Sequence, residues 1–227
     1  MANHGYLPRS GKDIDLAMVQ RAVAGAYNYA PTTFDSAFEQ AVAANLTTTG
    51  NPSTFHLADL AKHDAVEFDG SLSRNDFFFG DNLHYNPAIF AAVAKRLRLH
   101  ETGPSEMDDY VTVEMAAKAR AARVKDAKKV NPTFNASENA LMGSPGTTAL
   151  YLVTMWDDKV GAAPKAWVSS FFGRFCRVEQ HGRVVTNTDG RTEKERIPYR
   201  EGYKLPEAQR TGATIGDMFQ RVVAVKV

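Results

Sequence analysis

Apolar residues recur at helical spacing along most of this 227-residue chain, and this pattern constrains its fold more than any other feature. In the segment 13–30, Ile14, Met18, Val23 and Tyr27 fall along one helical face. Similar patterns predict helices over 33–44, 56–62, 86–97, 106–129, 146–156, 164–172 and 214–225. The segment 146–156 is apolar enough to be the central buried helix. We therefore expect an all-α array with long loops.

Composition indicates one globular domain. A chain of 227 residues with 44% hydrophobic and 23% charged residues can bury a sizeable core. No repeat or linker divides it, so we expect a single domain over 1–227. A net charge of +1 gives no reason to expect nucleic acid or an anionic membrane as partner. The basic run 118–125 follows Glu114 at helical spacing and is interpreted as a solvated helix face.

The run 67–76, Glu-Phe-Asp-Gly-Ser-Leu-Ser-Arg-Asn-Asp, carries the most chemical information, and we call it the signature run. The side chains of Glu67, Asp69 and Ser71, with backbone carbonyls at the glycine turn, are the oxygen ligands that Mg²⁺ and Ca²⁺ prefer. The alternative is a helix start capped by Asp69 or Ser71. The spacing alone leaves both interpretations open.

Three other blocks accompany the signature run. They are Asn-His-Gly-Tyr-Leu-Pro-Arg at 3–9, Asp-Phe-Phe-Phe-Gly-Asp-Asn at 76–82 with Asn-Pro at 86–87, and Glu-Arg-Ile-Pro-Tyr-Arg-Glu-Gly-Tyr at 195–203. In this order the four blocks resemble the fungal heme-thiolate peroxidases, the chloroperoxidase and unspecific peroxygenase family. The resemblance implies a chloroperoxidase-like helical fold. It also implies a Mg²⁺ beside a heme, held by the side chains of Glu67 and Ser71 and the backbone carbonyl of Phe68.

Three departures from the family pattern concern its chemistry. In the family a Pro-Cys-Pro segment precedes the first block and supplies the iron-ligating thiolate, whereas this chain starts at Met1 and its only cysteine is Cys176. The thiolate pushes electron density onto the iron and favours O–O cleavage. The family's acid–base histidine and glutamate correspond to Phe68 and Thr147. Neither side chain titrates near a working pH, so neither can move the peroxide proton.

These departures predict a member that has lost heme-thiolate chemistry. We expect a non-oxidative enzyme, catalysing a cyclisation, dehydration or isomerisation of a hydrophobic small molecule in fungal secondary metabolism. We expect no cofactor, and we leave open whether a Mg²⁺ is retained. Two alternatives stay open. One is a heme peroxidase or peroxygenase using hydrogen peroxide, with its cysteine upstream of Met1. The other is a ligand-binding pseudoenzyme.

The candidate catalytic residues are His63, His84 and Asp69. Imidazoles titrate near neutrality and suit acid–base work. His63 ranks first because it lies just before the signature run. Its alternative role is that of a hydrogen-bonded structural histidine. We expect Phe77, Phe78 and Phe79 to contribute to an aromatic pocket, as the resemblance implies.

An insertion relative to the family falls between 173 and 194. Alternating side chains around His181-Gly182 predict a β-hairpin near 174–192. Its role is open between surface decoration, a lid and a homodimer contact. No signal peptide is visible and no apolar run reaches membrane-spanning length, so we expect a cytoplasmic protein without a membrane partner. The alternative is a secreted protein in its mature form.

Overall fold

The computed structural model describes residues 1–134, 138–172, 178–180, 183–185 and 195–227, with the side chains of 138–142, 178–180 and 183–185 left out. The α-helices are α1 (Leu16–Tyr27), α2 (Asp35–Ala43), α3 (Pro87–Arg96), α4 (Val113–Val130), α5 (Glu138–Thr154), α6 (Lys165–Phe171) and α7 (Gly212–Val223). Short 3-10 helices are η1 (Ala2–His4), η2 (Pro31–Phe34), η3 (Leu57–Ala61), η4 (Phe77–Phe79), η5 (Glu106–Asp109) and η6 (Tyr199–Glu201). The predicted, mainly α-helical fold is confirmed.

Strands occur only as short antiparallel pairs in the described part of the chain. They are β1 (Ile14–Asp15) with β2 (Thr54–Phe55), β3 (Tyr110–Val111) with β4 (Ala163–Pro164), and β5 (Val178–Gln180) with β6 (Arg183–Val185). The last pair confirms the predicted hairpin. Its turn at 181–182, its flanks at 173–177 and 186–194, and Cys176 lie outside the described residues. The hairpin's role stays a prediction.

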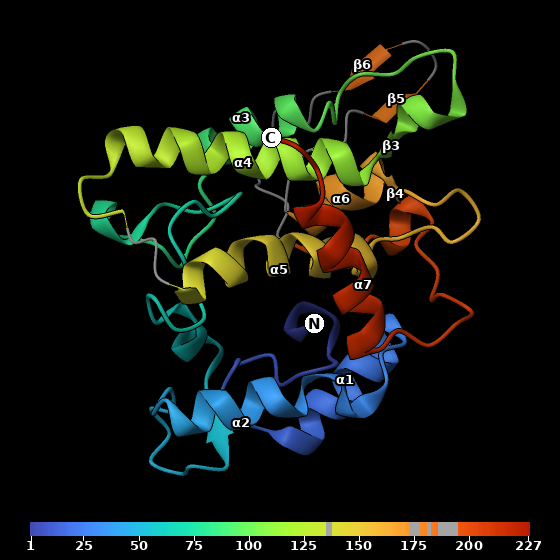
Figure 1. Ribbon diagram of the computed structural model, residues 1–227. Coiled ribbons are helices and arrows are strands. Elements are labelled where there is room, and N and C mark those ends of the chain that lie inside the picture. Colours follow the sequence, from blue (N-terminus) through green and yellow to red (C-terminus); the bar gives the residue numbers. More distant parts are fainter. Residues whose placement is uncertain (135–137, 173–177, 181–182, 186–194) are drawn as a thin grey trace.

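The core forms where α5 packs against α4 and α7. Figure 1 shows α4 above α5, with α1 and α2 at the opposite side of the molecule and the N-terminus between α5 and α1. Fully buried side chains in this core come from several helices and include Phe90, Leu152, Met155 and Val222. A second, smaller hydrophobic cluster consists of Leu7, Ile14, Ala22 and Phe55.

Two helices begin later than their periodicity predicts. The start of α1 is Leu16 rather than Asp13, because Ile14 and Asp15 pair with β2 and the Asp15 side chain caps the helix by accepting from Met18 N at 2.7 Å. Similarly, α4 begins at Val113, because the preceding residues form η5 and β3 and Thr112 provides the cap. Pairing with strands that are distant in the sequence decides both boundaries. The helical spacing of apolar residues carries no information about this pairing.

The central helix begins earlier than predicted. It starts at Glu138 rather than at 146 and continues through Pro145. A proline inside a helix loses one backbone hydrogen bond and crowds the preceding turn. Packing of α5 between α4 and α7 offsets this cost. The predicted start of α3 is correct, since Asn86 accepts from Ala88 N and Ile89 N and Pro87 follows it.

Candidate functional site

The signature run begins in a tight turn that brings His63 beside Glu67. Asp64 has a positive φ of 59°, and its amide donates to the Glu67 carbonyl at 2.9 Å. The His63 ring then donates from Nδ1 to Glu67 Oε2 at 3.0 Å, and Asn82 Nδ2 donates to the same oxygen at 2.9 Å. The other carboxylate oxygen, Oε1, is buried and has no hydrogen-bond partner among the described residues. An unsatisfied buried carboxylate oxygen is costly unless a ligand completes it.

His63 lies between two carboxylates. Its Nε2 stands 3.9 Å from Asp69 Oδ2, opposite the bond to Glu67, and its side chain is 19% exposed. The ring stacks on Phe77 with centroids 4.7 Å apart and planes 7° from parallel. The structure therefore brings His63 and Asp69 together, as a shared site requires. Their catalytic role stays a prediction.

Asp69 also belongs to a buried polar network that joins the signature run to α4. Asn131 Nδ2 donates to Asp69 Oδ2 at 3.1 Å and to Asp76 Oδ2 at 3.2 Å. Arg123 Nη2 binds Asp76 Oδ1 at 2.7 Å, and Arg123 Nε donates to the Ser71 carbonyl at 3.0 Å. All these side chains except that of Ser71 are buried. The network holds the run in place and keeps Asp69 fixed.

This network corrects the interpretation of the basic run 118–125 and supplies residues that the sequence analysis missed. Arg123 is buried in line with Ala116, Ala119 and Ala127 on one stripe of α4. An arginine within a stripe of buried alanines signals a buried acidic partner, and this signal was available in the sequence. Lys118, by contrast, is exposed and pairs with Glu114, as predicted.

The Phe68 side chain packs against α5. A Cβ added at Gly143 of α5 would overlap the Phe68 ring, so the ring lies directly on the helix at this glycine. Thr147, one turn further along α5, is exposed, and its hydroxyl donates to the Ser144 carbonyl at 3.0 Å. The two positions assigned to acid–base work thus hold a packed benzene ring and a hydroxyl engaged with its own helix.

His84 is not part of this site. Its side chain is 75% exposed and pairs with Asp81 at 2.8 Å on the surface. The His84 amide donates to Asp81 Oδ1 at 3.0 Å and, with the neighbouring hydrogen bonds, holds the pKa of that carboxyl below its usual range. The structure gives His84 a turn-stabilising contact.

The three phenylalanines of η4 do not line a closed pocket. Phe77, Phe78 and Phe79 are 55%, 49% and 47% exposed. Phe77 covers one face of the His63 ring. The expected aromatic pocket is therefore replaced, in the described structure, by an exposed aromatic turn beside the site.

The resembling blocks meet in space. Arg74 Nη2 of the signature run donates to both carboxylate oxygens of Glu195, each at 2.9 Å. Asn3 Nδ2 donates to the Glu195 carbonyl at 3.1 Å, and Ile197 N donates to His4 Nε2 at 3.1 Å. Burial is the main cause that lowers the pKa of His4, which suits an imidazole accepting a hydrogen bond. Many of the resembling residues therefore hold the blocks together.

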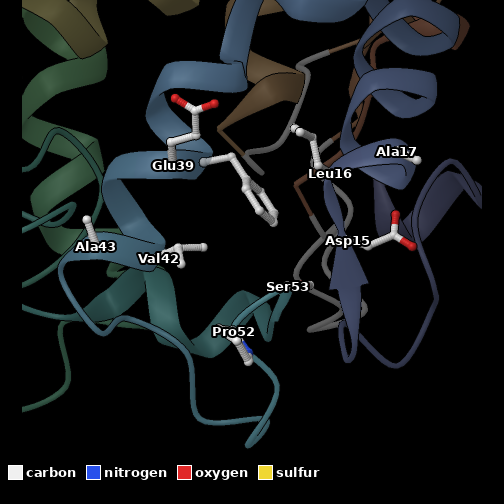
Figure 2. Close-up of a pocket in the computed structure, with 9 residues that line it drawn as sticks. Asp15, Leu16, Ala17, Glu39, Val42, Ala43, Pro52 and Ser53 are labelled. Atoms are coloured by element: carbon white, nitrogen blue, oxygen red, sulfur yellow. The ribbon is translucent and has the colours of Figure 1, made fainter.

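A groove also opens away from the signature run. A groove of about 580 Å³ opens between the start of α1 and α2 and is shown in Figure 2. Its lining residues are Asp15, Leu16, Ala17, Phe38, Glu39, Val42, Ala43, Pro52 and Ser53. Asp15 already caps α1, and no described histidine stands beside the second carboxylate of the lining, Glu39. The signature run, unlike this groove, places a histidine between two carboxylates.

Cation binding at the signature run would depend on few charged ligands. Within the described residues, no group of three histidine, cysteine, aspartate or glutamate side chains is arranged to hold a metal ion. Glu67 would therefore act with the Ser71 hydroxyl and the Phe68 carbonyl, both neutral donors. This set suits a hard cation that keeps other ligands, such as Mg²⁺.

Comparison with known proteins identifies the family. A family model described as "Peroxidase, family 2" matches residues 1–208. The chain belongs to the family 2 peroxidases. This confirms the resemblance to the heme-thiolate peroxidases and peroxygenases that the four blocks carry.

Two relatives of this family 2 peroxidase are both described as aromatic peroxygenases. The protein from Coprinellus radians is 28% identical over 151 residues, which cover 60% of this chain and 55% of that protein. The protein from Cyclocybe aegerita is 26% identical over 149 residues, which cover 60% of this chain and 38% of that protein. The match thus spans about half of one relative and less of the other. Membership favours the oxidative alternative over the non-oxidative enzyme expected from Phe68 and Thr147.

The length and hydrophobicity of the helices bear on whether one could cross a membrane. None of the helices in the described ranges is both long and apolar enough to span a bilayer. The cellular location and the partners stay predictions.

Proposed function

We propose that this family 2 peroxidase is a peroxide-dependent oxidoreductase of the heme-thiolate type that acts on an aromatic or otherwise hydrophobic small molecule. Family membership and the printed activity of the two relatives support the reaction class and the substrate class. The observation in this chain that supports the proposal is the buried Oε1 of Glu67, which has no hydrogen-bond partner in the described structure.

The residues present fit part of the group that the family implies. Glu67, Ser71 and the Phe68 carbonyl offer the oxygen donors for a hard cation that would neutralise a heme carboxylate. A bound heme would supply the reaction with peroxide, and the resemblance implies a cysteine thiolate as its iron ligand, which no described residue of this chain offers. Phe68 and Thr147 do not fit the usual proton transfer, so another group has to perform it.

We propose that His63 performs this proton transfer. It is the imidazole of the signature site, it hydrogen-bonds Glu67 at 3.0 Å, and Asp69 lies 3.9 Å from its other nitrogen. Glu67 and Asp69 directly flank Phe68 in the chain, so His63 lies beside the position that the family's histidine would occupy. The carboxylates on both sides orient the ring. His63 would therefore hold a proton for the peroxide step.

Peroxide-dependent turnover of a hydrophobic aromatic substrate tests this function. The wild type and His63→Gln are compared across pH, with His84→Gln as the matched exposed control. We expect His63→Gln to lower kcat by about 10²-fold or more, the usual contribution of an acid–base group, and to remove one limb of the pH profile. The His84→Gln variant should match the wild type. A wild type without peroxide-dependent turnover would overturn the proposed function.

A non-oxidative enzyme is the second candidate, because the two acid–base positions of the family hold Phe68 and Thr147. In that case the same His63–Asp69 pair would move a substrate proton without peroxide. The same assay separates the candidates: conversion that persists when peroxide is removed, and that is lost in His63→Gln, supports the non-oxidative enzyme. Ligand binding without any conversion supports a pseudoenzyme.

A further inference from the structure

Two phenols from opposite ends of the chain meet near the surface. The hydroxyl oxygens of Tyr6 and Tyr199 lie 2.8 Å apart, although the residues are 193 positions apart in sequence. Tyr199 is 41% exposed, and Tyr6 is half-buried. A small oxidant in solution can therefore reach the pair, which neither the proposed cation site nor the proton work at His63 uses.

Both rings are held by their neighbours. The Tyr6 ring lies on α1 at Gly25, where an added Cβ would stand 3.1 Å from its Cε1 atom. His4 contacts Tyr199 edge-on at 5.5 Å between ring centroids, and Tyr203 lies 6.1 Å from it. Tyr203 is itself buried and packs edge-on against Trp167 at 5.1 Å. Groups held together in this way react as if at very high local concentration.

The protonation state of Tyr199 suits its hydrogen bond with Tyr6. Burial, followed by the hydrogen bond with Tyr6, raises the pKa of Tyr199 well above its usual range. Tyr199 therefore stays a protonated phenol at neutral pH, hydrogen-bonded to Tyr6. A phenol that loses an electron becomes a strong acid and releases its proton, here to the solvent that reaches Tyr199.

We propose that Tyr6 and Tyr199 form an intramolecular oxidative cross-linking site. A one-electron oxidant removes one electron from each phenol, and each phenol releases one proton to water. The two phenoxyl radicals couple through an ortho carbon of one ring and either an ortho carbon or the oxygen of the other ring. Each ortho carbon that has coupled then gives up its hydrogen as a proton to the oxygen of its ring, which restores the phenol. In total, two electrons and two protons leave and one covalent bond forms.

The geometry favours coupling within one molecule. The phenolic oxygens lie 2.8 Å apart and each ortho carbon is two bonds from its oxygen, so the hydrogen bond keeps the carbons that would couple in the same neighbourhood. The bond would close a loop from the first resembling block to the last. Such a cross-link restricts the unfolded chain and stabilises the fold, more so for a long loop. Any one-electron oxidant strong enough to oxidise a phenol can drive the coupling, so the proposal stands independently of the proposed function.

The test oxidises the purified protein without a substrate, using photogenerated tris-bipyridyl ruthenium(III) with persulfate as the electron acceptor, at high dilution. We expect a monomeric product that has lost two hydrogen atoms, with one cross-linked peptide pair joining residues 6 and 199. Its thermal midpoint should exceed that of the untreated protein. Tyr6→Phe and Tyr199→Phe should each abolish the product, whereas Tyr110→Phe, which changes a half-buried tyrosine of β3, should retain it.

Three results would overturn the proposal. They are a product mapped to another tyrosine pair, cross-links found only between molecules and lost on dilution, and an unchanged yield in Tyr6→Phe. Thermal unfolding of the two Phe variants before oxidation shows that each is folded, so a lost product reports the missing hydroxyl. Each variant changes one hydroxyl and keeps the ring, which preserves the contacts at Gly25 and His4.

Discussion

Glu67 and Phe68 are sequence neighbours that face different surroundings. Glu67 keeps a buried oxygen without a described partner, whereas the Phe68 ring packs on α5 at Gly143. The sequence could identify both positions, because the signature run aligns them with a family pattern. It could not show that His63 bonds Glu67, because that contact depends on the left-handed turn at Asp64.

Changing Glu67→Gln tests the cation site. The substitution removes the charge of the only carboxylate among the three proposed donors. We expect the affinity for Mn²⁺, a spectroscopic substitute for Mg²⁺, to fall by more than about tenfold, a loss that even outer-shell partners of metal sites often cause. Electron paramagnetic resonance titration measures free Mn²⁺. Glu39→Gln on α2 is the control and should bind like the wild type; equal losses in both variants would contradict the assignment.

Gly143→Ala tests the position of Phe68. The new methyl group would overlap the ring, and overpacking of this kind costs about 1–3 kcal/mol of unfolding free energy. The control is Gly146→Ala on the same helix, where a Cβ meets nothing and helix propensity improves by up to about 1 kcal/mol. Urea denaturation measures both. If Gly143→Ala is as stable as Gly146→Ala, Phe68 does not lie on α5.

Tyr29 gives a pH prediction. Burial raises its pKa from 10.0 to about 12, so the folded protein keeps a proton that the unfolded chain loses. This stabilisation is complete below about pH 10 and disappears as pH rises to about 12; two pKa units correspond to about 2.7 kcal/mol. In Tyr29→Phe the loss of unfolding free energy between about pH 9 and 12 should be smaller by up to that amount. An unchanged loss would show that Tyr29 titrates normally when folded.

At the scale of elements, α4 combines an exposed charged face with one buried cation. Helical spacing predicts this helix, and an Asn-Pro start predicts α3 correctly. The starts of α1, α4 and α5 could not be predicted locally, because strand pairing and burial between neighbouring helices decide them. The buried ion pair of Arg123 with Asp76 is likewise a tertiary contact between segments 47 residues apart.

Arg123→Met tests that ion pair. Leaving Asp76 buried without its partner should cost about 3–5 kcal/mol of unfolding free energy. Lys118→Met on the same helix removes an exposed pair with Glu114 and should cost no more than about 0.5 kcal/mol. Chemical denaturation of both variants provides the comparison. Similar small losses would mean that the network around Asp76 does not hold the signature run.

At the scale of the whole molecule, the four resembling blocks converge although they span most of the chain. Asn3, Arg74 and Glu195 connect the first, second and last blocks, and Asn86 N donates to the Ser73 carbonyl at 2.8 Å. The family pattern therefore predicted the fold class, whereas the position of the site stays a prediction. The reaction stays a proposal, because Phe68 and Thr147 stand at the family's acid–base positions while the supporting contacts are kept.

The absorption spectrum of the protein, purified from cells supplied with a heme precursor, tests the central claim most directly. We predict a Soret band that moves, after reduction and addition of carbon monoxide, to the position typical of thiolate-ligated iron. A preparation that has no Soret band, and that converts a hydrophobic substrate without peroxide, would contradict the oxidative assignment and support the non-oxidative enzyme.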